Sequence, residues 1–176
     1  MYLIRDRYGI KPLIISKEEN CVIVSSESFF DNFERYTYTI EPGSLVCIDY
    51  KNQGIETLYN KKSPKLGHCS FEYIYFLKGV NEVNGVNVKS FREKISEKLK
   101  IQCNSVFENY DKKNILVCGV PSSGIIYGET FSKQFGFQYS QFLNKRKDYP
   151  HRTFILGSND ERLDACKKKY IVTENI

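Results

Sequence analysis

The stretch Asn114–Tyr139, NILVCGVPSSGIIYGETFSKQFGFQY, contains the pattern that decides the fold of the second half of the chain. An apolar run is followed by a turn of small residues at Pro121–Gly124, a helix-like segment to about Gln134, and a second apolar run after Gly136. Strand, turn, helix and strand in this order predict a βαβ unit with parallel strands. The turn then lies at the carboxyl edge of the sheet, where ligands bind, and the start of the helix can hold an anion.

A second helix is predicted upstream of this unit. Apolar residues recur at spacings of three and four between Val88 and Leu99, which is the period of one helix face. Asn87 precedes this pattern and can cap the helix. The opposite face, predicted to be solvated, carries Lys89, Arg92, Glu93 and Lys100.

The first third of the chain has the pattern of short β-strands. Four apolar runs, PLIIS, NCVIVSS, GSLVCIDY and GIETLY, are separated by turns rich in Gly, Pro and Asn. The polar segment 60–68, NKKSPKLGH, contains Pro and Gly and predicts a linker. We therefore expect two units, residues 1–66 and residues 67–176, of which the first is β-rich.

Composition places the chain among soluble globular proteins. Of its 176 residues 41% are hydrophobic and 27% charged, and no apolar run approaches the roughly 20 residues of a membrane helix. Arg5, Asp6 and Arg7 stand where a signal peptide would be apolar. We expect a cytoplasmic protein that does not bind membranes.

Cysteines and charge exclude several kinds of partner. The six cysteines form no CxxC pair or Cys/His cluster, and several lie in apolar runs, so free buried thiols are expected rather than a disulfide framework or a metal site. The net charge is +5, without the Lys/Arg stripe of a nucleic-acid-binding module. We expect no nucleic-acid partner; a phosphorylated small molecule is at least as good a candidate.

Several segments, in this order, resemble one family. FEYIYF (71–76) and RTFI (152–155) distinguish this family, because related glutamine-hydrolysing domains carry elements similar to RDRYGIKPL and SSES. Together they make residues 2–170 similar to glutamine phosphoribosylpyrophosphate amidotransferase. The remaining segments are RDRYGIKPL (5–13), SSES (25–28) and EPG (41–43).

The resemblance implies a fold class of α+β and α/β type. Residues 1–66 would be the C-terminal half of a glutaminase sandwich of the N-terminal-nucleophile type. Residues 67–176 would begin a type I phosphoribosyltransferase domain, with a basic flexible loop at 144–169. The implied activity is that of an amidophosphoribosyltransferase, in which glutamine and phosphoribosylpyrophosphate give phosphoribosylamine in the first step of purine synthesis.

Both implied catalytic centres are incomplete in this sequence. The family's nucleophile is an N-terminal cysteine with its α-amino group as base, whereas residue 2 is Tyr and the earliest cysteine is Cys21. No strand followed by two acids and a Thr/Gly-rich loop is present to hold the ribose and its 5′-phosphate. We therefore expect no catalytic residue in the chain, no activity in isolation, and weak or no binding of phosphoribosylpyrophosphate.

Some substrate-binding positions of the family have counterparts here. Ser123 aligns with a residue that contacts pyrophosphate-bound magnesium, the one cofactor the resemblance implies, and Ser122 stands where the family has an acid. Arg146, Tyr149 and Arg152 align with basic and tyrosine positions of the flexible loop. The alternatives are a Gly/Ser turn that caps a helix and a solvated basic loop without a ligand.

Other positions are assigned structural roles. Cys69 aligns with a cysteine that binds an iron–sulfur cluster in some relatives, but one thiolate cannot hold such a cluster, so no iron–sulfur site is expected. Arg5, Asp6, Ser26 and Glu27 are expected to support the architecture, and neither His68 nor His151 has an acidic partner nearby in sequence.

Three hypotheses for the whole chain remain. It is a split enzyme completed by another chain, a non-catalytic remnant that binds partners or forms homo-oligomers, or a binder of a phosphorylated ligand.

Overall fold

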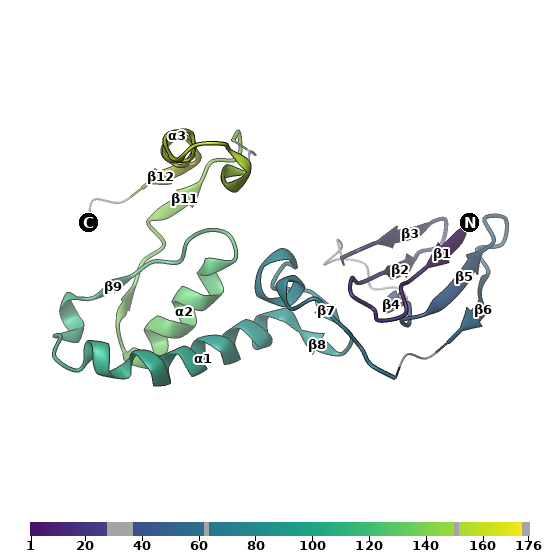
Figure 1. The fold of residues 1–176 in the computed structure, drawn as a ribbon, viewed down its shortest axis with the longest axis horizontal. Coiled ribbons are helices and arrows are strands. Elements are labelled where there is room, and N and C mark those ends of the chain that lie inside the picture. Colours follow the sequence, from purple (N-terminus) through teal and green to yellow (C-terminus); the bar gives the residue numbers. More distant parts are fainter. Residues whose placement is uncertain (28–36, 62–63, 150–151, 174–176) are drawn as a thin grey trace. The chain divides into compact units, whose positions relative to one another are not determined.

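The computed structural model describes residues 1–27, 37–61, 64–149 and 152–173 (Figure 1). It divides into two compact units, Met1–Phe91 and Arg92–Ile176, and each is described here by itself. The division falls later than the predicted boundary near residue 66, because residues 71–91 share a core with the first strands. Ser28, Pro150 and His151 lie outside the described residues. No helix in the described ranges is both long and apolar enough to cross a membrane.

The first unit contains two antiparallel three-stranded sheets, as its β-rich pattern predicted. The strand orders are β1-β5-β6 and β3-β2-β4. Leu3, Val46 and Ile48 of one sheet pack against Ile15 of the other and against Ile40, so the core lies between two sheets. The strands are β1 (Tyr2–Ile4), β2 (Ile14–Lys17), β3 (Val22–Ser25), β4 (Thr37–Thr39), β5 (Ser44–Ile48) and β6 (Ile55–Asn60).

The outer face of the β3-β2-β4 sheet has a core of its own. Ile14 and Ile15 are neighbours in β2 and therefore point to opposite faces. Ile14 packs with Tyr73 and Leu77, from the FEYIYF segment and the residue after it, and with Val83 and Val88. This segment forms η1 (Glu72–Phe76), a short π-helix, and it is followed by the small hairpin β7 (Glu82–Val83) and β8 (Val86–Asn87).

Helix α1 (Val88–Phe107) begins as the sequence predicted but differs on one face. The Asn87 side chain accepts a hydrogen bond from the Ser90 amide at 3.0 Å, which is the predicted cap. Arg92 was predicted to be solvated, and this is wrong: it is 2% exposed and hydrogen-bonds to the Tyr127 hydroxyl. Ser96 Oγ donates to the Tyr127 carbonyl at 3.1 Å, so this face of α1 packs against another helix.

The second unit contains the predicted βαβ arrangement. Strand β9 (Leu116–Val117), helix α2 (Gly124–Phe135) and strand β10 (Gln138–Tyr139) follow one another, and the two strands are parallel (Figure 1). Gly136 ends α2 with φ of 71°, the left-handed conformation that favours glycine. The short 3₁₀-helix η2 (Lys112–Asn114) precedes β9, and the Asp111 side chain caps it.

The predicted flexible loop over residues 144–169 is wrong for its second half, which is helical. Helix α3 (Asn159–Lys169) starts with a capping box in which Ser158 and Glu161 each bond to the other's backbone amide. Its acidic residues lie in the first turn and its lysines in the last, as the helix dipole favours. Along the chain, β11 (Leu143–Lys145) and the 3₁₀-helix η3 (Thr153–Ile155) come before α3, and β12 (Tyr170–Val172) follows it. Strands β11 and β12 pair antiparallel.

Candidate functional site

The turn between β9 and α2 is built on a close approach of two backbones. A Cβ atom on Gly119 would lie 2.5 Å from the Ile125 Cα and 2.7 Å from the Gly124 carbonyl oxygen. A Cβ atom on Gly128, one turn further along α2, would lie 3.0 Å from the Gly119 backbone. Only glycines allow the end of the strand to lie against the first turns of the helix. The turn is therefore held at the carboxyl end of β9, the edge at which parallel sheets bind ligands.

Tyr139 of the neighbouring strand β10 and Gln141, two residues further along the chain, fix this turn. Gln141 Nε2 donates to the Gly119 carbonyl at 2.7 Å and to the Leu143 carbonyl at 2.7 Å. The Tyr139 hydroxyl donates to Gln141 Oε1. Burial raises the pKa of Tyr139, and the nearby Glu129 raises it further, so the phenol keeps its proton. Sequence analysis missed these residues, although both lie in the apolar run after Gly136 that was predicted to be a strand.

Ser122 and Ser123 lie at the start of α2, where the resemblance places a magnesium and pyrophosphate contact. Ser123 is the N-cap residue, but its side chain makes no capping hydrogen bond. The first helical amides bond to backbone instead: the Gly124 amide donates to the Val120 carbonyl at 2.9 Å. The helix therefore starts without a side-chain cap from either serine. Ser122 is exposed and Ser123 half-buried, and within the described residues neither hydroxyl has a hydrogen-bond partner.

The loop residues implied by the resemblance are spread along the segment after β11. Arg146 makes a two-pronged ion pair with Asp148, at 2.8 and 3.1 Å, which lowers the pKa of Asp148 and raises that of Arg146. Arg152 is exposed and precedes η3, and Tyr149 is half-buried. In the described part of the chain, no hydrogen bond or ion pair joins Arg146 or Arg152 to either serine of the turn.

The turn fits a magnesium ion that is held mainly by a substrate. Among the described residues, no group of three or more His, Cys, Asp or Glu side chains forms a metal site. Magnesium needs few protein ligands where phosphate oxygens and waters complete its octahedral shell. The uncommitted Ser123 hydroxyl can supply one of these ligands, directly or through a water.

Arg5 and Asp6, two of the four polar residues expected to support the architecture, make such contacts. Arg5 is 3% exposed and donates to the carbonyls of Lys11, Ile40 and Gly9. The Asp6 carboxylate accepts the amides of Tyr8 and Ile10, at 2.9 and 3.0 Å, and so closes the turn that follows β1.

Cys69 and His68 lie beside this turn. The Cys69 amide donates to the Ile10 carbonyl at 3.0 Å. His68 Nε2 is buried without a partner among the described residues, and burial lowers the pKa of His68.

Comparisons with known proteins agree on one family name, although no family model matches the chain. The chain is 31% identical, over 172 residues, to the amidophosphoribosyltransferase of Methanothermobacter thermautotrophicus, covering 96% of this chain and 34% of that protein. It is 28% identical to the Drosophila melanogaster amidophosphoribosyltransferase, covering all of this chain and 34% of the relative.

A solved structure shows the same correspondence in three dimensions. The glutamine phosphoribosylpyrophosphate amidotransferase from B. subtilis, complexed with ADP and GMP, superimposes with a TM-score of 0.69 at 28% identity. The match covers 98% of this chain and 36% of that one. The chain spans about a third of the length of the relatives it matches. Along nearly its whole length, this chain is therefore homologous to about a third of an amidophosphoribosyltransferase.

Proposed function

We propose that these residues form the central part of an amidophosphoribosyltransferase, the enzyme that makes phosphoribosylamine from glutamine and phosphoribosylpyrophosphate in purine synthesis. The observation that carries the proposal is the β9–α2–β10 unit, whose glycine-lined turn ends in a serine with an uncommitted hydroxyl. This unit occurs in a chain about 30% identical to such enzymes over nearly its whole length.

The turn is proposed to receive the pyrophosphate end of the substrate. The N-terminal end of α2 contributes a positive dipole, and the Ser123 hydroxyl contributes a ligand for magnesium bound to the pyrophosphate. Magnesium would neutralise the negative charge that develops on the leaving pyrophosphate. Arg146, Tyr149 and Arg152 are proposed to contact the same substrate from the segment after β11, for which Arg146 would exchange Asp148 for a phosphate.

The first unit is proposed to support a glutaminase centre rather than to supply its nucleophile. Its two-sheet core and the Arg5 and Asp6 contacts hold the turn after β1 in place. Both reactions then require residues outside these 176: a cysteine with a free α-amino group, and an acidic pair for the ribose hydroxyls. We infer a cytosolic protein in which another segment or a complementing chain supplies them.

Reconstitution tests this proposal. The chain is co-expressed with the parts of the M. thermautotrophicus relative that it lacks, and phosphoribosylamine formation is measured with ammonia and with glutamine. We expect activity that depends on all parts, with a raised KM for phosphoribosylpyrophosphate in Ser123→Ala and no change in Ser105→Ala, an exposed serine on α1. A folded complex in which both variants match the parent would remove the role given to the turn.

One observation favours a second candidate, a non-catalytic module that binds a partner or a second copy of itself. On the face of the β1-β5-β6 sheet that points away from the core, Tyr2, Ile4 and Tyr59 are 68%, 74% and 55% exposed. Such an apolar face favours association. Size-exclusion chromatography of the chain, and of Ile4→Lys as a variant of this face, tests self-association: a monomer in both cases removes the homo-oligomer.

A further inference from the structure

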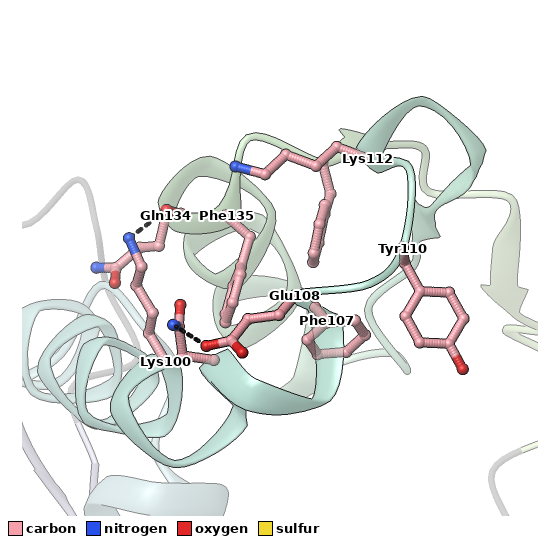
Figure 2. Close-up of a pocket in the computed structure, with 9 residues that line it drawn as sticks. Lys100, Phe107, Glu108, Tyr110, Lys112, Gln134 and Phe135 are labelled. Carbon is pink, nitrogen blue, oxygen red and sulfur yellow. Dashed lines mark hydrogen bonds between the residues drawn. The ribbon is translucent and has the colours of Figure 1, made fainter.

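A pocket in the second unit lies at the end of α2 opposite to the turn described above. It has a volume of about 250 Å³ and is lined by residues of the second half of α1, of the loop before β9, and of the last turn of α2 (Figure 2). None of these residues was singled out from the sequence as a site.

The floor of the pocket is a rigid aromatic cluster. The Phe135 and Phe137 rings stack with centroids 5.0 Å apart and an interplanar angle of 8°. The Phe107 ring meets both edge-on, at 5.4 and 5.2 Å. Phe135 and Phe137 are 5% and 7% exposed, so they shape the pocket from below rather than line its mouth. Such a floor resists collapse of the pocket, because each ring is fixed by two others.

The mouth of the pocket presents one exposed ring. Tyr110 is 63% exposed and lies edge-on to Phe107, with their centroids 6.3 Å apart. Its amide donates to the Phe107 carbonyl at 3.2 Å, which holds the chain as it leaves α1. A flat apolar molecule placed here would cover ring surface that now faces water, and this contributes to binding without any movement of the backbone.

Two ammonium groups reach the pocket from separate elements. Lys100 of α1 donates to the Gln134 carbonyl at 2.7 Å, and its Nζ lies 5.6 Å from the centroid of the Phe135 ring. Lys112 belongs to η2, and within the described residues its side chain has no carboxylate partner (Figure 2). A carboxylate or phosphate is the ligand group that two lysines attract.

The acidic side of the pocket limits where a negative charge can lie. Glu108 also lines the pocket and accepts a hydrogen bond from Asn104 Nδ2 at 3.3 Å. Its carboxylate repels an anion, so the charged end of a ligand must lie at the lysines and away from Glu108. Apolar walls with a few convergent polar groups are typical of small-molecule sites.

We propose that this pocket binds a small planar organic anion, with its ring against Tyr110 and Phe107 and its acid group at the ammonium groups of Lys100 and Lys112. Aryl carboxylates and aryl phosphates share this chemistry. The volume of about 250 Å³ admits a single ring with one acid group.

The test uses the full chain labelled with ¹⁵N, titrated with phenyl phosphate, benzoate, inorganic phosphate and the neutral benzyl alcohol at millimolar concentrations. We expect saturable changes in the NMR chemical shifts of the amides at 107–112 and 134–137 with the two aryl anions. With the other two probes we expect weaker changes or none. Differences between phenyl phosphate and benzoate then show which acid group is preferred.

Variants connect these shifts to the pocket. Lys112→Glu should weaken binding of the preferred anion roughly tenfold or more, since it replaces an attraction with a repulsion. Lys113→Glu changes the net charge by the same amount as Lys112→Glu, but Lys113 does not line the pocket. We therefore expect it to weaken binding less. Tyr110→Ser should weaken the binding of the aryl anions and leave the binding of inorganic phosphate unchanged. The absence of saturable shifts, equal effects of the two lysine variants, or equal shifts with inorganic phosphate and phenyl phosphate would overturn the proposal.

Discussion

The Lys11 ammonium forms an ion pair with the Glu72 carboxylate, and this contact joins the RDRYGIKPL segment to FEYIYF. The two partners differ in burial: the Lys11 side chain is 54% exposed and the Glu72 side chain only 11%. The hydrogen bond with Glu72 raises the pKa of Lys11, and the ammonium also lies 4.9 Å from the centroid of the Phe76 ring. Two segments far apart in sequence are thus held together within the first unit.

The unequal burial of this pair predicts unequal effects of removing either partner. Lys11→Ala leaves a nearly buried carboxylate without its cation, whereas Glu72→Gln leaves an ammonium that water can solvate. We expect Lys11→Ala to lower the free energy of unfolding by about 1–2 kcal/mol and Glu72→Gln by less. Urea denaturation of both variants measures this, and the reverse order would contradict the burial assigned to Glu72.

Arg5 is predicted to be the most sensitive charged residue of the first unit. Arg5→Met removes the donor to the Lys11, Ile40 and Gly9 carbonyls and leaves them to find other partners inside the fold. We expect a loss of about 3 kcal/mol or more in the free energy of unfolding, against a few tenths for Arg7→Met, whose residue is exposed. Denaturation curves that coincide for the two variants would show that the Arg5 contacts carry no stability.

His68 predicts a pH dependence of stability. Burial, followed by the charge of Arg5, lowers the pKa of His68 below its usual 6.5, while Asp6 acts in the opposite direction. The unfolded state therefore binds a proton more readily than the folded state, so stability is full above about pH 6.5 and falls as the pH drops through the folded pKa.

Melting temperatures measured between about pH 5 and 8 test this dependence. In His68→Gln the acid loss attributable to this residue should disappear, since the variant keeps every other titratable group of the protein. Parallel curves for the two proteins would rule out the role given to His68.

Gly119 predicts that the candidate site is intolerant of a single methyl group. The Cβ of Gly119→Ala would collide with the backbone of Ile125 and Gly124, which cannot move without displacing the start of α2. We expect a cost of about 1–3 kcal/mol in the second unit. Gly157→Ala serves as the control, because its Cβ would meet only the end of the Glu161 side chain at 3.5 Å. Equal amide-exchange protection of α2 in the two variants would contradict the close approach.

Local pattern was sufficient to predict several elements. The β-rich first unit, the parallel βαβ unit and the Asn87 cap follow from turn residues, apolar runs and one side chain at a helix start, all of which act over a few residues. The end of α2, predicted at about Gln134, follows in the same way, because Gly136 adopts a positive φ at little cost.

Features that depend on distant partners could not be predicted. Arg92 is buried because Tyr127, 35 positions later, accepts its hydrogen bond, and no pattern within α1 reveals that partner. The division after Phe91 differs from the boundary predicted near residue 66 because Tyr73 packs against Ile14, which lies far away in sequence. Helix α3 was different, since its Ser158–Glu161 capping box was visible, but its polar composition was interpreted as a loop. The site residues Tyr139 and Gln141 were missed because their role depends on the Gly119 carbonyl.

The most direct test of the central claim is a covalent chimera. Residues 2–170 of this chain replace the homologous third of the M. thermautotrophicus amidophosphoribosyltransferase, and phosphoribosylamine formation is measured with glutamine and with ammonia as nitrogen donors. The account predicts turnover with both donors, because the supplied parts carry the nucleophile and the acidic pair while this chain supplies the turn and the supporting sheets. A soluble, cooperatively folded chimera that makes no phosphoribosylamine from either donor would contradict it.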